Sequence, residues 1–350
     1  METGINYPSS NNFKSVFKIG SHFLGKGYPC FIIAEAGVSH FGNINKAFML
    51  VDAAVDAGAD AVKFQIFKTE EMISVESPEW IARMKPKELP LSAFIEIRDY
   101  CKEKGIIFFA TAHDPKSFEE LTQIDPPCIK IGSGEVQNYE FYRLAALYRK
   151  PIILSTGMFL KDNIIQVLKV LAESGCSEVA LMHCVTEYPT PPGDINLRMI
   201  QTLKSLFPGP VGYSDHAATY DIAAASVLLG ANLIEKHITL KKNIPDAQDW
   251  KVSCTPGELV EFVSSVRRLE AALGKGEFKL TDGEKKSMRW ARKSIVAARD
   301  IQEGEVINKD DITFKRPGTG ISPANVESVV GKRALKFIKK DYLIMEDMIG

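Results

Sequence analysis

The sequence predicts an α/β protein, a (β/α)8 (TIM) barrel followed by a small β-rich domain. Between Cys30 and Gly274, eight short apolar runs alternate with helical patterns, as an eightfold barrel requires. After Gly274 the helical periodicity gives way to short strands and turn signals. An open doubly wound sheet is the alternative, but it would need a glycine-rich phosphate turn after the first strand. The stretch AEAGVSHFGN at that place does not match GxGxxG.

The predicted elements set the domain boundaries. The strand-like runs cover residues 30–38, 61–67, 106–113, 128–134, 151–157, 179–185, 211–216 and 233–239. Helical patterns between and after them include residues 45–58, 91–105, 162–175, 220–229 and 256–274. We therefore predict a polar preamble at 1–29, the barrel at 30–274, a linker with a short helix at 275–293, and the β-rich domain at 294–350.

Composition excludes several classes of protein. The formal net charge is −1, so nothing indicates a surface for nucleic acid or anionic membrane. No apolar run approaches the roughly 20 residues of a membrane helix, and the N-terminus lacks the apolar core of a secretory signal. The six cysteines are scattered without CxxC spacing, which argues against a zinc ribbon or a disulfide framework. We expect a cytoplasmic protein.

Two histidines follow neighbouring predicted strands. His216 lies just past the strand at 211–216, and His237 lies late in the strand at 233–239. The helical pattern between them makes this a βαβ unit with parallel strands, whose tips converge on one edge. Two imidazoles placed this way are a plausible pair of ligands for a divalent metal, with carboxylates or waters completing the shell. The alternative is that each is an ordinary hydrogen-bonded histidine; we favour the metal.

Polar residues also end most of the other predicted strands. The active site of such a barrel lies at the carboxyl ends of its strands. A packed interior tolerates polar groups there only where they line a site. These residues are Glu35, Lys63, Gln65, Thr111, His113, Lys130, Ser133, Glu135, Ser155, Thr156, His183, Thr186, Tyr188, Ser214, Asp215, His216, Glu235, Lys236 and His237.

Two lysines among them indicate an anion site. Lys63 and Lys130 would place two ammonium groups in a water-poor funnel, where an unpaired charge is costly. The hydroxyls of Ser133, Ser155 and Ser214 add neutral donors suited to phosphate. For either lysine alone, a salt bridge to a strand glutamate such as Glu35 or Glu235 is an equally good interpretation. For the set, we favour an anionic ligand.

Two other functions fit the same barrel. One is a metal-independent aldolase that forms a Schiff base on Lys130 or Lys236. The other is a non-catalytic carbohydrate-binding protein. The complete set of polar strand tips argues against the second, because buried lysines without a role would be replaced by apolar residues.

Several segments, in the same order, resemble the sialic acid (nonulosonic acid) synthase family with its C-terminal antifreeze-like, or SAF, domain. The resemblance runs from about residue 30 to the C-terminus. Its segments are IIAEAGVSHFGN (32–43), AVKFQIFKTEEM (61–72), IKIGSGEVQNY (129–139), PIILSTGM (151–158), HCVTEYPTP (183–191), VGYSDH (211–216), IEKHITL (234–240), SIVAARDIQEGEVI (294–307) and FKRPGTGI (314–321).

The resemblance implies a reaction and a cofactor. The family condenses phosphoenolpyruvate with an N-acylated amino hexose, such as N-acetylmannosamine, and releases phosphate. It uses a divalent metal, commonly Mn2+ or Mg2+, which by motif match His216 and His237 would hold. The metal would polarise the aldehyde of the open-chain sugar. Glu35 matches a carboxylate near the metal, and Glu135 matches one suited to proton handling.

The resemblance also implies the residues that hold the substrates. Those matching the phosphoenolpyruvate site are Lys63, Lys130, Ser133, Ser155 and Ser214. Those matching or lining the sugar site are Gln65, Thr111, Tyr188, Glu187, Asp249 and Arg316. In this family the SAF domain of one subunit covers the barrel mouth of its partner. The resemblance therefore implies a homodimer in which Arg316 contacts the partner's sugar; the alternative is a surface charge on a turn.

The chain departs from the family pattern in two places. After the strand-eight histidine the family has a Gly-Pro-Asp-like segment, whereas this chain has IPDAQDW. Either Asp246 or Asp249 would take the aspartate's role, and we favour Asp249. Glu187 occupies a position that is often Asn or Ser in the family. A carboxylate there favours a differently substituted sugar, such as a 2,4-diacetamido-6-deoxy hexose.

Overall fold

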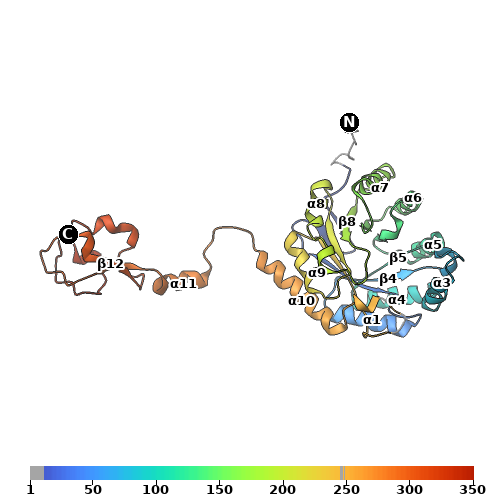
Figure 1. Cartoon of the computed structure of the whole chain (residues 1–350), viewed down its shortest axis with the longest axis horizontal. Helices are drawn as coiled ribbons and strands as arrows, with labels where there is room; N and C mark the ends of the chain where they lie inside the picture. Colours follow the sequence, from blue (N-terminus) through green and yellow to red (C-terminus); the bar gives the residue numbers. More distant parts are fainter. Residues whose placement is uncertain (1–11, 245–246, 248) are drawn as a thin grey trace. The chain divides into compact units, whose positions relative to one another are not determined.

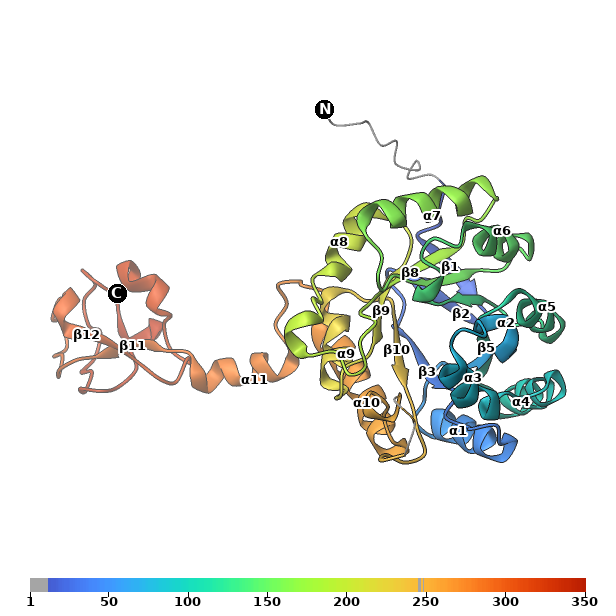
Figure 2. The ribbon, with the colours of Figure 1, turned by 45° about the vertical axis from the view of Figure 1, so that its right-hand side comes forward.

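The computed structural model of the chain describes residues 12–244, 247 and 249–350. The chain divides into two compact units, Met1–Gly274 and Lys275–Gly350, which are described separately below. In the first unit a closed sheet is surrounded by helices (Figures 1 and 2). The second unit is small and has little regular secondary structure.

Eight parallel strands close into a barrel in the order β10-β3-β4-β5-β6-β7-β8-β9. The predicted barrel is thus confirmed, and each predicted strand is found within a few residues of its predicted ends. The strands are β3 Phe31–Gly37, β4 Ala61–Ile66, β5 Ile107–Ala112, β6 Ile129–Ile131, β7 Ile152–Ser155, β8 Val179–Cys184, β9 Val211–Asp215 and β10 Leu233–His237.

Helices follow the strands and cover the outside of the barrel (Figure 2). They are α1 Ile44–Asp56, α2 Thr69–Met72, α3 Pro78–Met84, α4 Leu91–Lys104, α5 Pro115–Ile124, α6 Tyr139–Leu147, α7 Lys161–Glu173, α8 Met199–Leu206, α9 Asp221–Ala225 and α10 Pro256–Leu273. The helix predicted at 220–229 is shorter than expected. Its last turn, Ser226–Leu229, is a 3-10 helix that ends at Gly230 in the left-handed conformation.

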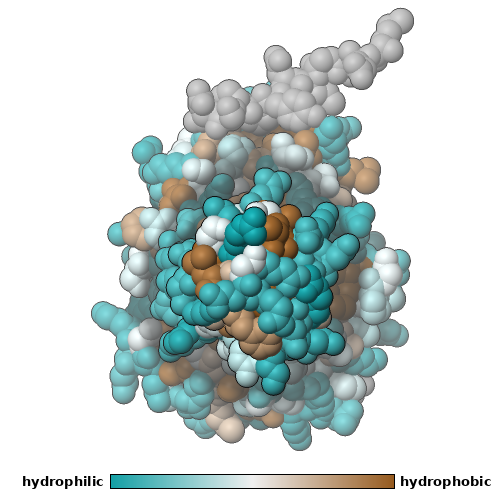
Figure 3. Space-filling view, turned by 90° about the vertical axis from the view of Figure 1, so that its left-hand side faces the viewer, coloured by the Kyte–Doolittle hydropathy of each residue, from teal (hydrophilic) through white to brown (hydrophobic). Residues whose placement is uncertain are grey.

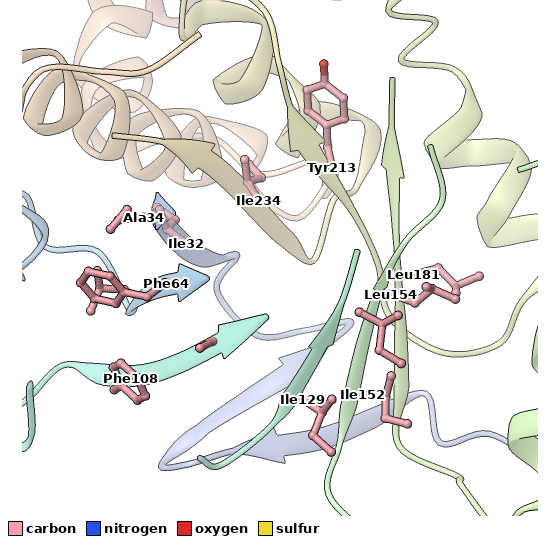
Figure 4. Close-up of a cluster of buried hydrophobic side chains, with 14 of the residues drawn as sticks. Ile32, Ala34, Phe64, Phe108, Ile129, Ile152, Leu154, Leu181, Tyr213 and Ile234 are labelled. Atoms are coloured by element: carbon pink, nitrogen blue, oxygen red, sulfur yellow. The ribbon is translucent and has the colours of Figure 1, made fainter. Parts of the chain in front are cut away.

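Side chains alternate along each strand between the helices and the barrel interior. On β3, Ile32 and Ala34 point outward into the core beneath the helices, with matching residues from the other strands (Figure 4). Phe31 and Ile33 point inward and join a separate apolar cluster at the bottom of the barrel. The next inward position on β3 is Glu35, so the interior changes from apolar to polar as the strands approach their carboxyl ends.

A hairpin that the sequence did not reveal closes the bottom of the barrel. β1 Val16–Ile19 pairs with β2 His22–Gly25 inside the segment predicted as a polar preamble. Phe17, Ile19 and Leu24 are buried in the same cluster as the inward side chains of the strands. Only alternate residues of two four-residue strands are apolar and buried, which is too short a pattern to recognise in a polar segment.

The second unit contains α11 Asp282–Ala291, β11 Ser294–Ala297 and β12 Ile312–Lys315, with isolated bridges and 3-10 turns. Its small core includes Ile295, Ile301 and Ile338. The face shown in Figure 3 is largely hydrophilic, with a few separate hydrophobic patches. The β-rich domain predicted after the barrel is confirmed, and the short helix expected before it is α11.

Two further findings bear on the predictions from composition. No helix in the described part of the chain has the length and apolar content needed to cross a membrane. All six cysteines are buried free thiols, which agrees with the absence of paired spacing in the sequence.

The hairpin gives the first testable prediction. Leu24→Ala should lower the free energy of unfolding of the barrel by about 2–4 kcal/mol, because Leu24 is fully buried in the bottom cluster. Urea denaturation would measure this. Phe23→Ala, in the same strand but 41% exposed, is the control and should cost less than about 1 kcal/mol. Equal losses in the two variants would show that the hairpin is not part of the barrel core.

Candidate active site

Two connected cavities open at the carboxyl ends of the barrel strands. The inner cavity, of about 180 Å3, is lined mainly by inward strand residues. The outer cavity, of about 400 Å3, is lined mainly by the loops that follow the strands. The residues that line both are Gln65, His113, Thr186, Tyr188 and His237. The site therefore has a deep polar chamber and a wider outer chamber that share one boundary.

The alternation of the strands brings most of the predicted residues into the inner cavity. Its lining contains Glu35, Lys63, Gln65, Thr111, Lys130, Ser133, Glu135, Ser155, Tyr188, Ser214, His216 and His237. Each strand contributes one or two inward residues near its carboxyl end, above the apolar cluster, and the segments after the strands contribute the rest. These residues are spread over about 200 residues of sequence, and closure of the barrel brings them together.

Lys63 is the centre of a buried charge cluster. Its Nζ lies 3.3 Å from Glu35 Oε2 and 3.2 Å from Glu235 Oε2, and all three side chains are at most 4% exposed. The two carboxylate oxygens are close enough for ion pairs but are not aligned for hydrogen bonds. Nζ also donates to Thr111 Oγ1 at 3.2 Å. The salt bridge that was the alternative interpretation of Lys63 is therefore present, on the floor of a cavity.

The two glutamates of this cluster differ in protonation. Burial raises the pKa of Glu35, and Lys63 opposes that shift only in part. Burial acts on Glu235 too, but Lys130 and Lys63 together bring its pKa below the usual value. Two carboxylates that share one lysine are thus driven apart in pKa. Glu235 stays ionised, and Glu35 is the carboxyl group able to gain or lose a proton near neutral pH.

Lys130 is less well compensated than Lys63. Its Nζ donates to Ser155 Oγ at 2.8 Å, while Glu235 Oε1 is 3.8 Å away. Burial lowers the pKa of Lys130 to about 8, and Lys63 adds to that effect while Glu235 opposes it. Ser214 donates to the same glutamate at 3.0 Å. An anion in this chamber would find one ammonium group with little competing negative charge.

The two predicted histidines lie side by side. The ring centroids of His216 and His237 are 5.4 Å apart, and the ring of Tyr188 contacts both. His216 Nδ1 is 2.6 Å from the carbonyl of Val185, so it carries the proton, and Nε2 accepts from Tyr188 Oη at 2.8 Å. Burial, followed by the neighbouring His237, lowers the pKa of His216 to about 3, and burial also lowers that of His237. Both rings are neutral at physiological pH.

These residues fit a metal held by few protein ligands. Neutral imidazoles are metal ligands, and the proton on Nδ1 of His216 leaves Nε2 as the donor atom. No group of three or more His, Cys, Asp and Glu side chains suited to a metal occurs in the part of the chain that the structure describes. A cation at this pair would complete its shell with water and substrate oxygens, which is the arrangement of an open, catalytic site.

Ser133 lies at the edge of the inner cavity against Gly157. Its Oγ accepts the backbone N–H of Gly157 at 2.9 Å. A Cβ on Gly157 would lie 2.8 Å from that oxygen and 2.4 Å from Thr186 Oγ1, so a larger residue would displace both side chains. Glu135 follows in the same 3-10 turn, where burial raises its pKa and Asn138 donates to it at 2.6 Å.

Three of the predicted polar strand residues face away from the site. Lys236 lies at an outward position of β10, and its Nζ contacts Asp215, outward on β9, at 2.5 Å and the carbonyls of Ala217 and Thr219. His183, outward on β8, lies 2.6 Å from the carbonyl of Ile195. None of the three lines the inner or the outer cavity, so Lys236 is not available as a Schiff-base lysine. The alternation of strand residues could have predicted this outward position from the sequence.

Three predicted sugar-site residues lie outside the inner cavity. Asp249 lines the outer cavity, whereas Asp246, the other candidate, lies outside the described residues. Glu187 is exposed and lines neither cavity. Arg316 belongs to the second unit, where its guanidinium lies over Trp290 and its Nε donates to the carbonyl of Ala291 at 3.0 Å.

The outer cavity also contains residues that sequence reasoning missed. Trp80, Arg83 and Lys87 come from the excursion between β4 and α4, which contains α2, α3 and the 3-10 turn Lys85–Lys87. This excursion is polar and irregular, and no pattern in it indicates a barrel mouth. Its position depends on contacts with loops far along the chain.

Comparison with known proteins identifies the family. Residues 50–278 match the NeuB family, and residues 292–350 match the SAF domain. The chain belongs to the NeuB family. It is an enzyme, and the resemblance inferred from the sequence segments is confirmed.

Several relatives of this NeuB-family enzyme are named as nonulosonic acid synthases. It is 40% identical over 330 residues to the N,N'-diacetyllegionaminic acid synthase of Campylobacter jejuni, covering 90% of this chain and 98% of that one. It is 33% identical over 344 residues to the human N-acetylneuraminate-9-phosphate synthase, covering 93% and 94%. A solved sialic acid synthetase from Leptospira borgpetersenii has a TM-score of 0.73 at 34% identity, over 78% of this chain and 95% of that one.

Proposed function

We propose that this protein condenses phosphoenolpyruvate with an N-acylated amino hexose and water, giving a nine-carbon 2-keto sugar acid and phosphate. The acceptor is N-acetylmannosamine or a 2,4-diacetamido-6-deoxy hexose. The observation that carries the proposal is the inner chamber, in which buried lysines and hydroxyls lie beside a pair of neutral imidazoles. The names of the relatives support the same reaction class.

The inner chamber suits phosphoenolpyruvate in size and charge. Lys130 supplies the ammonium group with the least competing negative charge, and Ser155 beside it supplies a hydroxyl. Ser133 and Ser214 add further neutral donors around the cavity. The charge of Lys63 is balanced by its two glutamates, so it adds little net positive charge. A dianionic enol phosphate would replace water around these donors and gain charge-assisted hydrogen bonds.

The reaction forms one carbon–carbon bond and exchanges one carbon–oxygen bond at C2 for another. C3 of phosphoenolpyruvate attacks the aldehyde carbon of the open-chain sugar, and the aldehyde oxygen takes a proton. Water adds at C2, which has become electron-poor, and loses one proton to leave a hydroxyl group there. The bond from C2 to the phosphate ester oxygen then breaks, the hydroxyl proton passes to the leaving phosphate, and C2 becomes the ketone. Glu35 and Glu135, both with raised pKa, are placed to handle these protons.

A divalent metal, Mn2+ or Mg2+, would be held by His216 and His237. When bound there it would act as a Lewis acid on the sugar aldehyde. The chain's own contribution is to keep both rings neutral by burial and to fix His216 through the Val185 carbonyl. Gln65 and Tyr188 at the boundary of the two chambers would orient the sugar, with Thr111 on the inner side and Asp249 on the outer side. Gln65 itself is fixed by its 2.9 Å hydrogen bond to Glu35.

We also propose a homodimer in which the SAF domain of one subunit covers the barrel mouth of its partner. The basis is the family resemblance together with Arg316, whose exposed guanidinium is fixed by Trp290 and Ala291 within its own unit. This arginine would contact the acyl group of the sugar bound in the partner.

Phosphate release tests the main proposal. Purified protein with phosphoenolpyruvate, Mn2+ and a panel of acylated hexosamines should release phosphate, and a chelator should stop it. His216→Ala should lower turnover by about 100-fold or more, because the aldehyde loses its polarising group. His22→Ala, in the hairpin with a side chain 43% exposed, is the matched control.

Three results would contradict parts of this proposal. Unchanged turnover in His216→Ala would end the metal assignment. Inactivation by borohydride with pyruvate, together with indifference to chelator, would favour a Schiff-base aldolase on Lys130. No turnover with any acylated hexosamine would favour a carbohydrate-binding protein without catalysis.

The pKa of Lys130 gives a prediction about pH. The ammonium form attracts phosphoenolpyruvate and is lost as the pH rises through about 8. Above that value, kcat/KM for phosphoenolpyruvate should fall about tenfold per pH unit. Lys63 stays charged, because its glutamates raise its pKa in spite of burial. Lys130→Arg should retain activity to higher pH, and a profile that stays flat to about pH 9.5 would rule out this role.

Subunit mixing tests the cap. Arg316→Ala and His216→Ala should each be inactive alone, whereas isolated mixed dimers should regain about half of wild-type activity, because one subunit's cap completes the other's barrel at one of the two sites. The measurement is phosphate release after co-expression with two affinity tags. If the mixture stays inactive while wild-type dimers form normally, Arg316 does not act in the partner's site.

A further inference from the structure

The two histidines proposed to hold the metal each follow one member of a buried ion pair. Asp215 and Lys236 are directly opposite each other on β9 and β10. His216 and His237 are the next residues along the chain. The side chains of Asp215 and Lys236 point away from the barrel interior and are 0% and 1% exposed. The ion pair therefore lies on the outer side of the two strand ends whose inner side carries the imidazoles.

Lys236 has an acceptor for every one of its donors. Its Nζ lies 2.5 Å from Asp215 Oδ2, 2.7 Å from the carbonyl oxygen of Ala217 and 3.1 Å from that of Thr219. An ammonium group has three N–H donors, so these three acceptors satisfy it completely. One side chain of β10 thus binds three points of the segment 215–219, where β9 ends.

Asp215 holds the same segment through its other oxygen. Its Oδ1 accepts from Tyr213 Oη at 2.7 Å and from the backbone N–H of Ala217 at 2.7–3.1 Å range's upper value, 3.1 Å. His216 is therefore fixed on both sides along the chain, because Asp215 and Ala217 are each bound to Lys236. Since Lys236 immediately precedes His237, a single ion pair connects the backbone at the two histidines.

The surroundings of this ion pair are apolar. On the same outward faces, Tyr213 of β9 and Ile234 of β10 belong to the core beneath the helices. Two charges lose their hydration there, and well-packed apolar residues of similar size are often at least as stabilising. An apolar pair would not, however, make directed bonds to the carbonyls of Ala217 and Thr219. The ion pair differs from such a pair in the geometry that it specifies.

We propose that the ion pair of Asp215 and Lys236 positions the two metal ligands, setting the separation of the His216 and His237 rings from outside the barrel. The inference rests on the proposed metal site and adds two residues that touch neither the metal nor a substrate. Two imidazoles bind one cation only when their free nitrogens converge on one point. Mn2+ has the lowest affinity of the first-row divalent metals for a given site, so a site with two protein ligands depends on this spacing.

Mn2+ binding to a variant with an apolar pair tests the inference. The double variant Asp215→Leu with Lys236→Met removes both charges together, so it should fold with a Tm within a few degrees of the wild type. Isothermal titration calorimetry should show Mn2+ binding weakened about 10- to 100-fold, as for other residues that orient metal ligands. The Kd for phosphoenolpyruvate, measured without metal, should change less than about threefold, because Lys130 and Ser155 lie on other strands.

The matched control removes an ion pair at the other end of the barrel. Asp60, the residue before β4, pairs with Arg267 of α10 at 2.8 Å. The double variant Asp60→Asn with Arg267→Met should lower the Tm and leave Mn2+ affinity at the wild-type value. Weakened Mn2+ binding in this control would overturn the inference, because any loss of stability would then be enough to disturb the metal site.

Two results in the apolar variant would also overturn it: unchanged Mn2+ affinity, or equal weakening of Mn2+ and phosphoenolpyruvate binding. If that variant does not fold, Asp215→Asn, which keeps the size of the side chain, takes its place and should weaken Mn2+ binding about threefold or more. His216→Ala separates the inference from the proposed function. If it binds Mn2+ as the wild type does, or neither binds, the metal site itself is wrong; Mn2+ binding lost in His216→Ala but retained in the apolar variant defeats only the inference.

Discussion

The ion pairs of Lys63 with Glu35 and Glu235 are the interaction on which the rest of the site depends. Three charges are almost completely removed from water, which is tolerable only because opposite charges meet at about 3 Å. They meet because β10, β3 and β4 are neighbours in the closed barrel, and each carries its charge at the inward position. An open sheet would separate β10 from β3 and leave Glu235 without its lysine.

This cluster also divides the interior of the barrel by depth. Below it, the inward residues of the same strands are Phe31, Ala61 and Leu233, which pack on the hairpin as ordinary apolar core. Above it, polar groups line a cavity. Packing in the apolar half of the barrel interior fixes the separation of the strands. This separation in turn sets the distances between the polar side chains above it. The positions of Lys130 and of the two histidines are therefore set by packing that takes no part in the chemistry.

The barrel and the inner chamber could be predicted because both depend on a local, repeated pattern. Apolar runs mark the strands, and the last polar residue of each inward face marks the site. The alternation of inward and outward residues along each strand would also have placed Lys236 and His183 on the outside of the barrel. The outer chamber could not be predicted, because Arg83 and Lys87 reach it through a contact between Gly42 and Pro86, about 40 residues apart, that leaves no periodic signal. The hairpin was missed because its two four-residue strands are too short to show an alternating pattern.

The hairpin has a consequence for how ligands travel. With the floor of the barrel filled by Ile19 and Leu24, the described residues place the openings of both chambers at the other end, where the strands terminate. With the chambers occupied as proposed, phosphoenolpyruvate and the sugar would enter from that end, and the keto acid and phosphate would leave from it. Substrates and products would then share one entrance, because the hairpin closes the opposite end of the barrel.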